Sequence, residues 1–244
     1  MRLALLSDVH SNLEALLAVR EELRHLRVDR VCCLGDVVGY GASPNECTAA
    51  VRELCEVTIL GNHDAAVAGR MEYGFYYEAA RHALDWTAAR IDPAQRTWLA
   101  GLPFVHREGD AYGLCHGSPL EPEAYEYVYE PEHAEALIPL AAALPEVTFV
   151  GHSHLCRGYA LAGGEVHDVL APRIPVKRGV RYLVSVGSVG QPRDGDSRAC
   201  FAVYDTDARE IVFHRVSYDV QASARKIFEA DLALYFGERL FRGL

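Results

Sequence analysis

Five short apolar runs in this sequence each stop at a small polar signature, and this repeated pattern constrains the fold more than any other feature. An apolar run of roughly four to eight residues that ends in a turn is typical of a buried strand. The polar residues therefore follow strands, at the sheet edge where α/β proteins bind ligands. The signatures are Asp8-Val9-His10, Gly35-Asp36, Gly61-Asn62-His63-Asp64, His116-Gly117 and Gly151-His152-Ser153-His154.

The N-terminal part of the chain predicts strands that alternate with helices. We expect strands at residues 3–6, 31–34 and 57–60, with helices at 13–26 and 45–54 between them. Apolar residues recur at helical spacing in the first of these helices. Such alternation implies parallel strands joined by right-handed crossovers, so the C-terminal ends of the strands share one edge.

The rest of the chain predicts a second group of strands. Residues 73–102 are expected to be helical, with a helix start at Asp92-Pro93, and residues 220–236 form a closing helix. Strands are expected at 111–115, 147–150 and 182–186, and antiparallel hairpin strands at 157–161, 165–170, 200–204 and 210–216. No linker divides residues 1–244, so we predict a single α/β domain: two mixed β-sheets packed face to face with helices on the outside, a four-layer αββα sandwich.

Charge and composition exclude several classes of function. Thirty-four acidic against 24 basic side chains give a formal net charge of −10, so no broad basic face is expected to bind long nucleic acid. The first apolar run is too short for a signal peptide, and no run is long enough to span a membrane. Seven cysteines without a CxxC pair predict reduced thiols. The cytoplasm is the expected compartment.

The side chains of the five signatures are those that bind divalent metals. They offer carboxylate oxygen, amide oxygen and imidazole nitrogen, and no thiolate. Each signature alone has an ordinary explanation: Asp8 and Asp36 as helix N-caps, Asn62 as a turn residue, and Gly151-His152 as a tight turn. The five together favour a metal site, because unrelated turns would not supply a complete ligand set.

In this order, the motifs D-x-H, G-D-x-x-G-Y-G, G-N-H-D, H-G and G-H-S-H resemble the calcineurin-like metallophosphoesterase superfamily. The likeness runs from residue 3 to about residue 190 and is closest to the compact phosphodiesterase-type members of bacteria and archaea. It implies that one metal is bound by Asp8, His10 and His154, that the other is bound by Asn62, His116 and His152, and that Asp36 bridges them. It also implies that His63 is catalytic and binds no metal.

Elementary electrostatics agrees with that assignment. Two divalent ions bring a charge of +4, which Asp8 and Asp36 offset only in part, so the site attracts phosphate inside an acidic protein. The expected nucleophile is a hydroxide that bridges the two metals. A protonated His63 would assist the leaving oxygen, and Asp64 would orient its imidazole and raise its pKa. Mn²⁺ is the expected metal, with Fe or Zn²⁺ as alternatives.

Each segment or residue that could contact the substrate has two possible interpretations. The segment 125–130 is either a strand with one solvated face or a flap whose Tyr125 and Tyr127 contact the substrate; the aromatic patch at 73–77 allows the same choice. Arg193 either clamps phosphate or pairs with a neighbouring aspartate.

We expect hydrolysis of a small phosphate ester, with phosphodiesterase activity favoured. The alternatives are a protein Ser/Thr phosphatase, a dinucleoside tetraphosphatase or, because relatives of this fold include interaction modules, a non-enzymatic scaffold. The ligand would accordingly be nucleotide-like or a phosphoprotein. The sequence does not indicate the oligomeric state.

Overall fold

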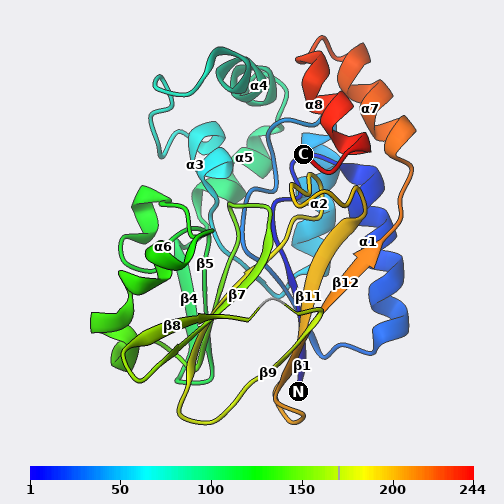
Figure 1. Cartoon of the computed structure of the whole chain (residues 1–244). Helices are drawn as coiled ribbons and strands as arrows, with labels where there is room; N and C mark the ends of the chain where they lie inside the picture. The colour runs from blue at the N-terminus through cyan, green and yellow to red at the C-terminus, as the bar shows by residue number, and fades with distance from the viewer. Residues whose placement is uncertain (170) are drawn as a thin grey trace.

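The computed structural model describes residues 1–169 and 171–244 and contains two mixed six-stranded sheets packed face to face (Figure 1). The first sheet has the strand order β3-β2-β1-β11-β12-β9, and the second has the order β4-β5-β6-β10-β7-β8. The predicted fold class is therefore confirmed. Within the described residues, no helix is both long enough and apolar enough to cross a membrane. All seven cysteines are free thiols.

The first sheet begins with the predicted strand and helix alternation. Its strands β1, β2 and β3 are parallel, and helices connect them. Asn12 caps the N-terminus of the α1 helix, because its side chain accepts a hydrogen bond from the backbone N–H of Ala15. The helix buries Leu16 and Val19 against the sheet. The bounds are β1 Arg2–Leu6, α1 Leu13–Leu26, β2 Arg30–Cys33, α2 Pro44–Leu54 and β3 Val57–Thr58.

Three antiparallel strands complete this sheet: β11 (Ala199–Asp205), β12 (Glu210–Val216) and β9 (Arg173–Pro175). We expected the hairpin strands to form part of the second sheet. For β11 and β12 this is wrong, because both belong to the first sheet. The β11 strand pairs with β1, with Leu3 opposite Tyr204. Alternating hydrophobicity predicts a strand with two different faces, but it does not reveal which sheet the strand joins.

The second sheet contains the remaining predicted strands. Its centre is parallel, because β5 and β10 both run alongside β6 in the same direction. The strand predicted at 165–170 ends at Asp168, and residue 170 lies outside the described residues. The short edge strands β4 and β9 were not predicted. The bounds are β4 Val105–Glu108, β5 Tyr112–Cys115, β6 Val147–Val150, β7 Cys156–Ala162, β8 Glu165–Asp168 and β10 Arg181–Val186.

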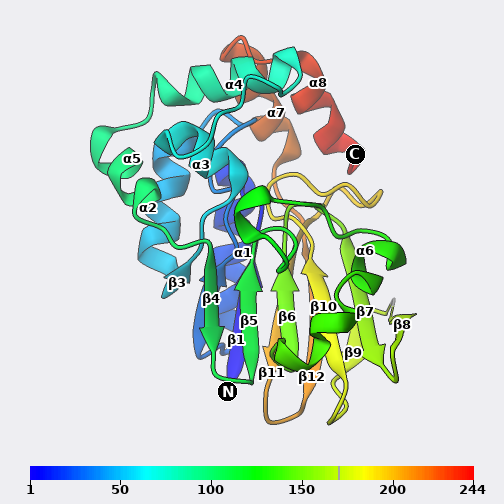
Figure 2. The same ribbon diagram turned by 90° about the vertical axis from the view of Figure 1, so that its left-hand side faces the viewer.

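One apolar layer lies between the two sheets. Leu5 in β1 and Leu34 directly after β2 share one cluster with Phe149 and Val184 of the second sheet. All four side chains are fully buried. Burying such a side chain stabilises the fold by about 1.5–3 kcal/mol. Outside, α1 and α2 cover the first sheet, whereas the second is covered by α6 (Pro131–Glu135) and the 3₁₀ turns η1 (Pro122–Ala124) and η2 (Ile138–Ala143) (Figure 2).

Five further helices gather above the C-terminal ends of the parallel strands (Figures 1 and 2). They are α3 (Asn62–Ala68), α4 (Glu78–Ala88), α5 (Pro93–Ala100), α7 (Val220–Glu229) and α8 (Leu234–Glu238), and the turn η3 (Arg239–Phe241) follows α8. The α5 helix starts at Asp92-Pro93 as predicted. The single closing helix predicted at 220–236 is wrong, because the chain turns after α7 to bury both Leu232 and Phe236.

The C-terminal helices are fixed to the rest of the molecule by a separate apolar cluster. Phe236 is fully buried, and its ring centroid lies 4.7 Å from that of Tyr40, in the loop after β2. Ala80 and Ala83 of α4 belong to the same cluster. This cluster therefore joins the end of the chain to the loop that carries Asp36.

Phe236→Ala should lower the free energy of unfolding by about 3–5 kcal/mol, the usual cost of removing a buried phenyl ring. Phe241→Ala is the matched control, because Phe241 lies in the same segment and is 51% exposed. Urea unfolding followed by circular dichroism measures both. Equal, small losses in the two variants would show that the C-terminal helices do not depend on this cluster.

Candidate metal centre

The loops that carry the signatures are bonded to one another at a single edge of the two sheets. Asp8 donates its backbone N–H to the carbonyl of Gly35 at 3.0 Å, and His10 donates to that of Asp36 at 2.9 Å. Gly151 donates to the carbonyl of His116 at 2.9 Å. The sheet packing then brings the first two loops against the others, so five segments distant in sequence meet in one small volume.

Strained backbone marks the same residues. Five of them adopt left-handed φ angles between +46° and +63°, a region that residues other than glycine rarely occupy: Asp8, His10, Asp36, His152 and His154. Each such conformation costs on the order of 1–3 kcal/mol and persists only where the surroundings impose it. Concentration of this cost at the signatures points to a functional requirement on where these side chains are directed.

Two glycines allow the second and third loops to touch. A Cβ atom on Gly61 would lie 2.2 Å from both the backbone nitrogen and the Oδ1 atom of Asp36. A Cβ atom on Gly35 would lie 2.4 Å from the nitrogen of Gly61, and its φ is +93°. The carboxylate of Asp36 therefore occupies its position only because the facing residue has no side chain.

The candidate ligand atoms lie close together and are buried. Within the described residues, three groups have ligand atoms within 4.8 Å of one another: Asp8 with His10 and His154, Asp36 with His116 and His152, and His10 with Asp36 and His63. The first group contains the three residues expected to hold one ion, and the second joins the expected bridge Asp36 to two of the three residues expected to hold the other. Asp36 Oδ2 lies 3.6 Å from His10 Nε2 and 3.3 Å from His116 Nε2, so this carboxylate stands between them.

Backbone carbonyls fix the orientation of three imidazoles. The Nδ1 atom of His10 lies 3.1 Å from the carbonyl of Val38, and those of His116 and His154 lie 2.6 Å from the carbonyls of Leu34 and Gln191. A carbonyl only accepts, so each Nδ1 carries a proton and each Nε2 atom faces the cluster. In the neutral rings of His10 and His154 this Nε2 atom presents a lone pair. Metal-binding histidines are held in this way.

The resulting arrangement fits cations. The Nε2 atoms of His10 and His154 face each other at 3.1 Å, and two lone pairs at that separation repel unless a positive charge lies beside them. The buried Oδ1 atom of Asp8 has no hydrogen-bond partner within the described residues, and it lies 3.3 Å from His154 Nε2. Burial raises the pKa of Asp8 to about 6. Divalent ions would satisfy both groups.

Asn62 presents its oxygen to the same cluster. Its Nδ2 donates to the hydroxyl of Tyr76 at 2.7 Å, and its Oδ1 lies 3.1 Å from His116 Nε2. Burial lowers the pKa of His10, His152 and His154, which keeps these imidazoles neutral as metal ligation requires. Burial alone would also lower the pKa of His116, but the charge of Asp36 raises it to about 9.

The contact predicted between Asp64 and the His63 imidazole is not formed. Asp64 instead braces the backbone: its Oδ1 accepts the N–H of Val38 at 3.1 Å and its Oδ2 accepts that of Gly61 at 3.2 Å. The His63 Nδ1 atom is buried against Gly39 and has no partner within the described residues. Burial lowers the pKa of His63 to about 4, opposite to the expected rise. Because the Asp64 carboxylate accepts hydrogen bonds from two backbone N–H groups, it does not orient the His63 ring.

A pocket of about 330 Å³ opens over the cluster, and Asp36, Asn62, His63, His152 and His154 line its floor. Aromatic residues form its walls: Tyr40, Phe75, Tyr76, Tyr77, Tyr125 and Tyr127. Segment 125–130 contains no strand. The ring of Tyr127 stacks on His152 at 3.9 Å, and the buried Tyr125 lies 5.8 Å from the ring of His116. The geometry favours the flap interpretation of this segment over the strand.

Arg193 also lines this pocket. The aspartates beside it are engaged elsewhere, Asp194 with Arg215 and Asp196 with Arg198. Within the described residues, Arg193 makes no ion pair, and its Nη2 donates to Gln191 Oε1 at 3.0 Å. The alternative in which Arg193 pairs with a neighbouring aspartate is therefore wrong.

Two features of the site were not anticipated from the sequence. Tyr76 holds the Asn62 amide, although only the aromatic patch around it was noted. Tyr40 follows Gly39 in the second motif and lies 4.4 Å from the His63 ring, between that ring and the C-terminal helices. The position of Tyr40 inside the second motif could have indicated that it belongs to the site. For Tyr76, the local sequence gave no such indication.

Comparison with known proteins gives consistent matches. A model of the family described as "Calcineurin-like phosphoesterase superfamily domain" matches residues 1–209. An uncharacterised protein of Methanocaldococcus jannaschii is 35% identical over 246 residues, which cover 99% of this chain and 98% of that protein.

Two crystal structures align over the whole chain. A metallophosphoesterase from Sphaerobacter thermophilus superposes with a TM-score of 0.87 at 36% identity, over 100% of both chains. A hypothetical protein from Pyrococcus horikoshii superposes with a TM-score of 0.80 at 19% identity, over 100% of this chain and 98% of that one. The second likeness concerns the fold alone.

Gly61→Ala should abolish stoichiometric metal binding, because the new Cβ would displace the Asp36 carboxylate. Gly74→Ala is the control, since a Cβ there meets no atom within 4 Å. Elemental analysis after dialysis against Mn²⁺ and then metal-free buffer gives the metal content, and circular dichroism confirms folding. A folded Gly61→Ala protein with the metal content of the parent would refute the steric account.

Proposed function

Because the chain belongs to the calcineurin-like phosphoesterase superfamily, we propose that its phosphoester hydrolase site acts on small phosphodiesters with two Mn²⁺ ions bound. The observation that carries the proposal is the pair of imidazole nitrogens of His10 and His154, which face each other at 3.1 Å. Beside them lies the Oδ1 atom of Asp8, which has no hydrogen-bond partner within the described residues. Such a cluster is unfavourable without cations and well suited to them.

The ligand sets follow the geometry. Asp8, His10 and His154 would hold one ion, Asn62, His116 and His152 the other, and Asp36 both. When bound, two divalent ions polarise phosphoryl oxygens and lower the pKa of a coordinated water toward neutrality, which supplies the nucleophile. The donor set combines four imidazole nitrogens with two carboxylates and one amide oxygen and contains no thiolate, which accommodates Mn²⁺ as it does Fe or Zn²⁺.

His63 acts on the phosphoryl group as a hydrogen-bond donor. Its Nδ1 edge is packed against Gly39, so the ring offers its Nε2 edge to the pocket it lines. No carboxylate within the described residues hydrogen-bonds the ring to hold an additional proton. A neutral Nε2–H aimed at the reacting group stabilises the charge that develops there, in the manner of an oxyanion-hole donor.

The pocket walls support a diester. A phosphodiester carries two organic groups on one phosphorus. The pocket over the candidate metal ligands is lined by aromatic residues from two separate segments of the chain. Tyr76 and Tyr77 come from the segment before α4, whereas Tyr125 and Tyr127 come from the loop after β5. Aromatic rings bind apolar or planar substituents, so each wall can take one of the two ester groups.

Mn²⁺-loaded protein should hydrolyse bis-p-nitrophenyl phosphate with a higher kcat/KM than p-nitrophenyl phosphate. The two substrates share a leaving group, so the comparison isolates the second ester substituent. The absorbance of released p-nitrophenolate gives the rate of hydrolysis of each substrate. Failure to hydrolyse either substrate would contradict the phosphoester hydrolase site, and preference for the monoester would contradict the diester assignment alone.

His63→Ala should keep both metal ions and lose about 10²–10³ in kcat, the usual effect of removing one such donor. The loss should be similar for a p-nitrophenolate and an alkoxide leaving group, because the donor acts on the phosphoryl oxygens. His116→Ala is the contrasting variant and should lose metal. A deficit much larger for the alkoxide would show that His63 protonates the leaving group instead.

A further inference from the structure

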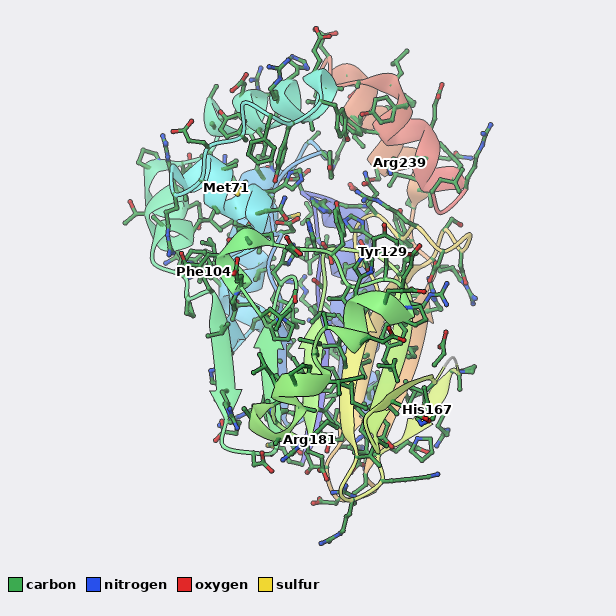
Figure 3. The ribbon with its side chains drawn as sticks, turned by 60° about the vertical axis from the view of Figure 1, so that its left-hand side comes forward. Met71, Phe104, Tyr129, His167, Arg181 and Arg239 are labelled. Atoms are coloured by element: carbon green, nitrogen blue, oxygen red, sulfur yellow. The ribbon has the colours of Figure 1, made fainter. Side chains whose placement is uncertain are left out.

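Two cysteines from different sheets bring their sulfur atoms together. Cys156 is the first residue of β7 in the second sheet, and Cys200 lies in β11 of the first sheet. The β7 strand lies next to β8, the edge strand that carries the His167 labelled in Figure 3. The two Sγ atoms are 3.0 Å apart, and no other pair of cysteine sulfurs within the described residues is in hydrogen-bonding contact. This pair therefore differs from the other five thiols.

The backbone at Gly187, directly after β10, leaves space for both sulfur atoms. A Cβ atom there would lie 2.7 Å from the Cys200 Sγ atom and 3.0 Å from that of Cys156, and the φ of +81° favours glycine. A disulfide bond is about 2.05 Å long, so the sulfurs would need to approach by only about 1 Å. The two thiols are thus held close to bonding distance.

The two thiols differ in their exposure. Cys156 is half-buried and lines a surface pocket of about 520 Å³, which shares no lining residue with the pocket over the candidate metal ligands. Cys200 has no exposed surface and does not line that pocket. A small reagent that enters the pocket therefore reaches Cys156 first, and Cys200 reacts only with the group that forms there.

Hydrogen bonds give the two sulfurs different roles. The Nη2 atom of Arg215, on β12, donates to the Cys156 Sγ atom at 3.1 Å. The Cys200 Sγ atom instead donates to the carbonyl of Val186 at 3.7 Å. An ion pair with Asp194 fixes the Arg215 guanidinium, which stabilises negative charge on Cys156 as this sulfur attacks. The Cys200 thiol and burial raise the pKa of Cys156, an effect that Arg215 opposes. The pair therefore rests as two thiols and needs an oxidant to react.

We propose that Cys156 and Cys200 form an oxidation site, at which hydrogen peroxide converts two thiols into a disulfide that joins the two sheets. The Cys156 sulfur attacks one peroxide oxygen, the O–O bond breaks and one water leaves, which gives a sulfenic acid. The Cys200 sulfur then attacks the Cys156 sulfur, and the S–O bond breaks. A second water leaves with the proton of Cys200, and the two thiols have supplied the two electrons that reduce the peroxide. The site does not depend on phosphoester hydrolysis.

Peroxide treatment of the folded protein tests the site directly, with EDTA present to prevent metal-catalysed oxidation. One equivalent of hydrogen peroxide should remove two of the seven free thiols, and mass spectrometry of proteolytic peptides should find Cys156 crosslinked to Cys200. Dithiothreitol should restore both thiols. Cys55→Ser is the matched control and should crosslink as the parent does, because Cys55 is also half-buried but has no sulfur partner within the described residues. Loss of no thiols, or a crosslink at another pair, would overturn the site.

Two single variants separate the roles of the sulfurs. In Cys200→Ser, oxidation should stop at the Cys156 sulfenic acid, which dimedone labels. In Cys156→Ser, Cys200 should gain no dimedone label, because it is buried. Circular dichroism checks folding, and Cys200→Ala replaces the serine variant if that protein does not fold. A label on Cys200 in Cys156→Ser would overturn the order of attack, and no label in either variant would overturn the sulfenic acid step.

Arg215→Gln should slow formation of the crosslink about 10-fold or more, because it removes a charged donor from the attacking sulfur. Arg198→Gln is the matched control. Arg198 lines the same pocket and pairs with Asp196, and no hydrogen bond joins it to a sulfur within the described residues. Quenching with iodoacetamide at timed intervals gives the rate of crosslinking in each variant. Equal rates in the two variants would overturn the role assigned to Arg215.

Discussion

Close contact between the Gly35-Asp36 and Gly61-Asn62 loops is the constraint on which the rest of the site depends. A Cβ atom on Gly61 would lie 2.2 Å from the Asp36 carboxylate, so the position of the bridging candidate is set by the absence of a side chain. Asp64 reinforces this contact by accepting N–H groups from Val38 in one loop and from Gly61 in the other. The strained backbones of Asp8, His10 and Asp36 are tolerated because these contacts impose them.

This rigid arrangement has electrostatic consequences beyond the cluster. Carbonyl groups at Val38, Leu34 and Gln191 fix an imidazole proton on Nδ1 of each of three histidines, which directs their Nε2 atoms to the place where cations would bind. With two divalent ions bound, the floor would be cationic and would favour anionic substrates in a protein whose overall charge is negative. Aromatic walls line the pocket above this floor, and the C-terminal helices reach it through Tyr40.

The sequence predicts the motif-bearing core well, because strand ends and metal ligands are local patterns. Asp8 and His10 after β1, or His152 and His154 after β6, stand where their apolar runs end. Pairing partners were less predictable: β11 joins β1 rather than the second sheet, since alternation carries no information about neighbours. The break between α7 and α8 was missed because burial of Phe236 against Tyr40 is a tertiary contact. The role of Asp64 was wrong because adjacency to His63 in sequence does not make its carboxylate face the ring.

The central claim is that this cluster of side chains holds two ions bridged by Asp36. Anomalous diffraction at the manganese edge, from crystals of the protein grown with Mn²⁺, tests it most directly. The account predicts two peaks about 3.5–4 Å apart, one against Asp8, His10 and His154 and the other against Asn62, His116 and His152, with the Asp36 carboxylate between them. A single peak, or peaks that Asp36 does not contact, would contradict it.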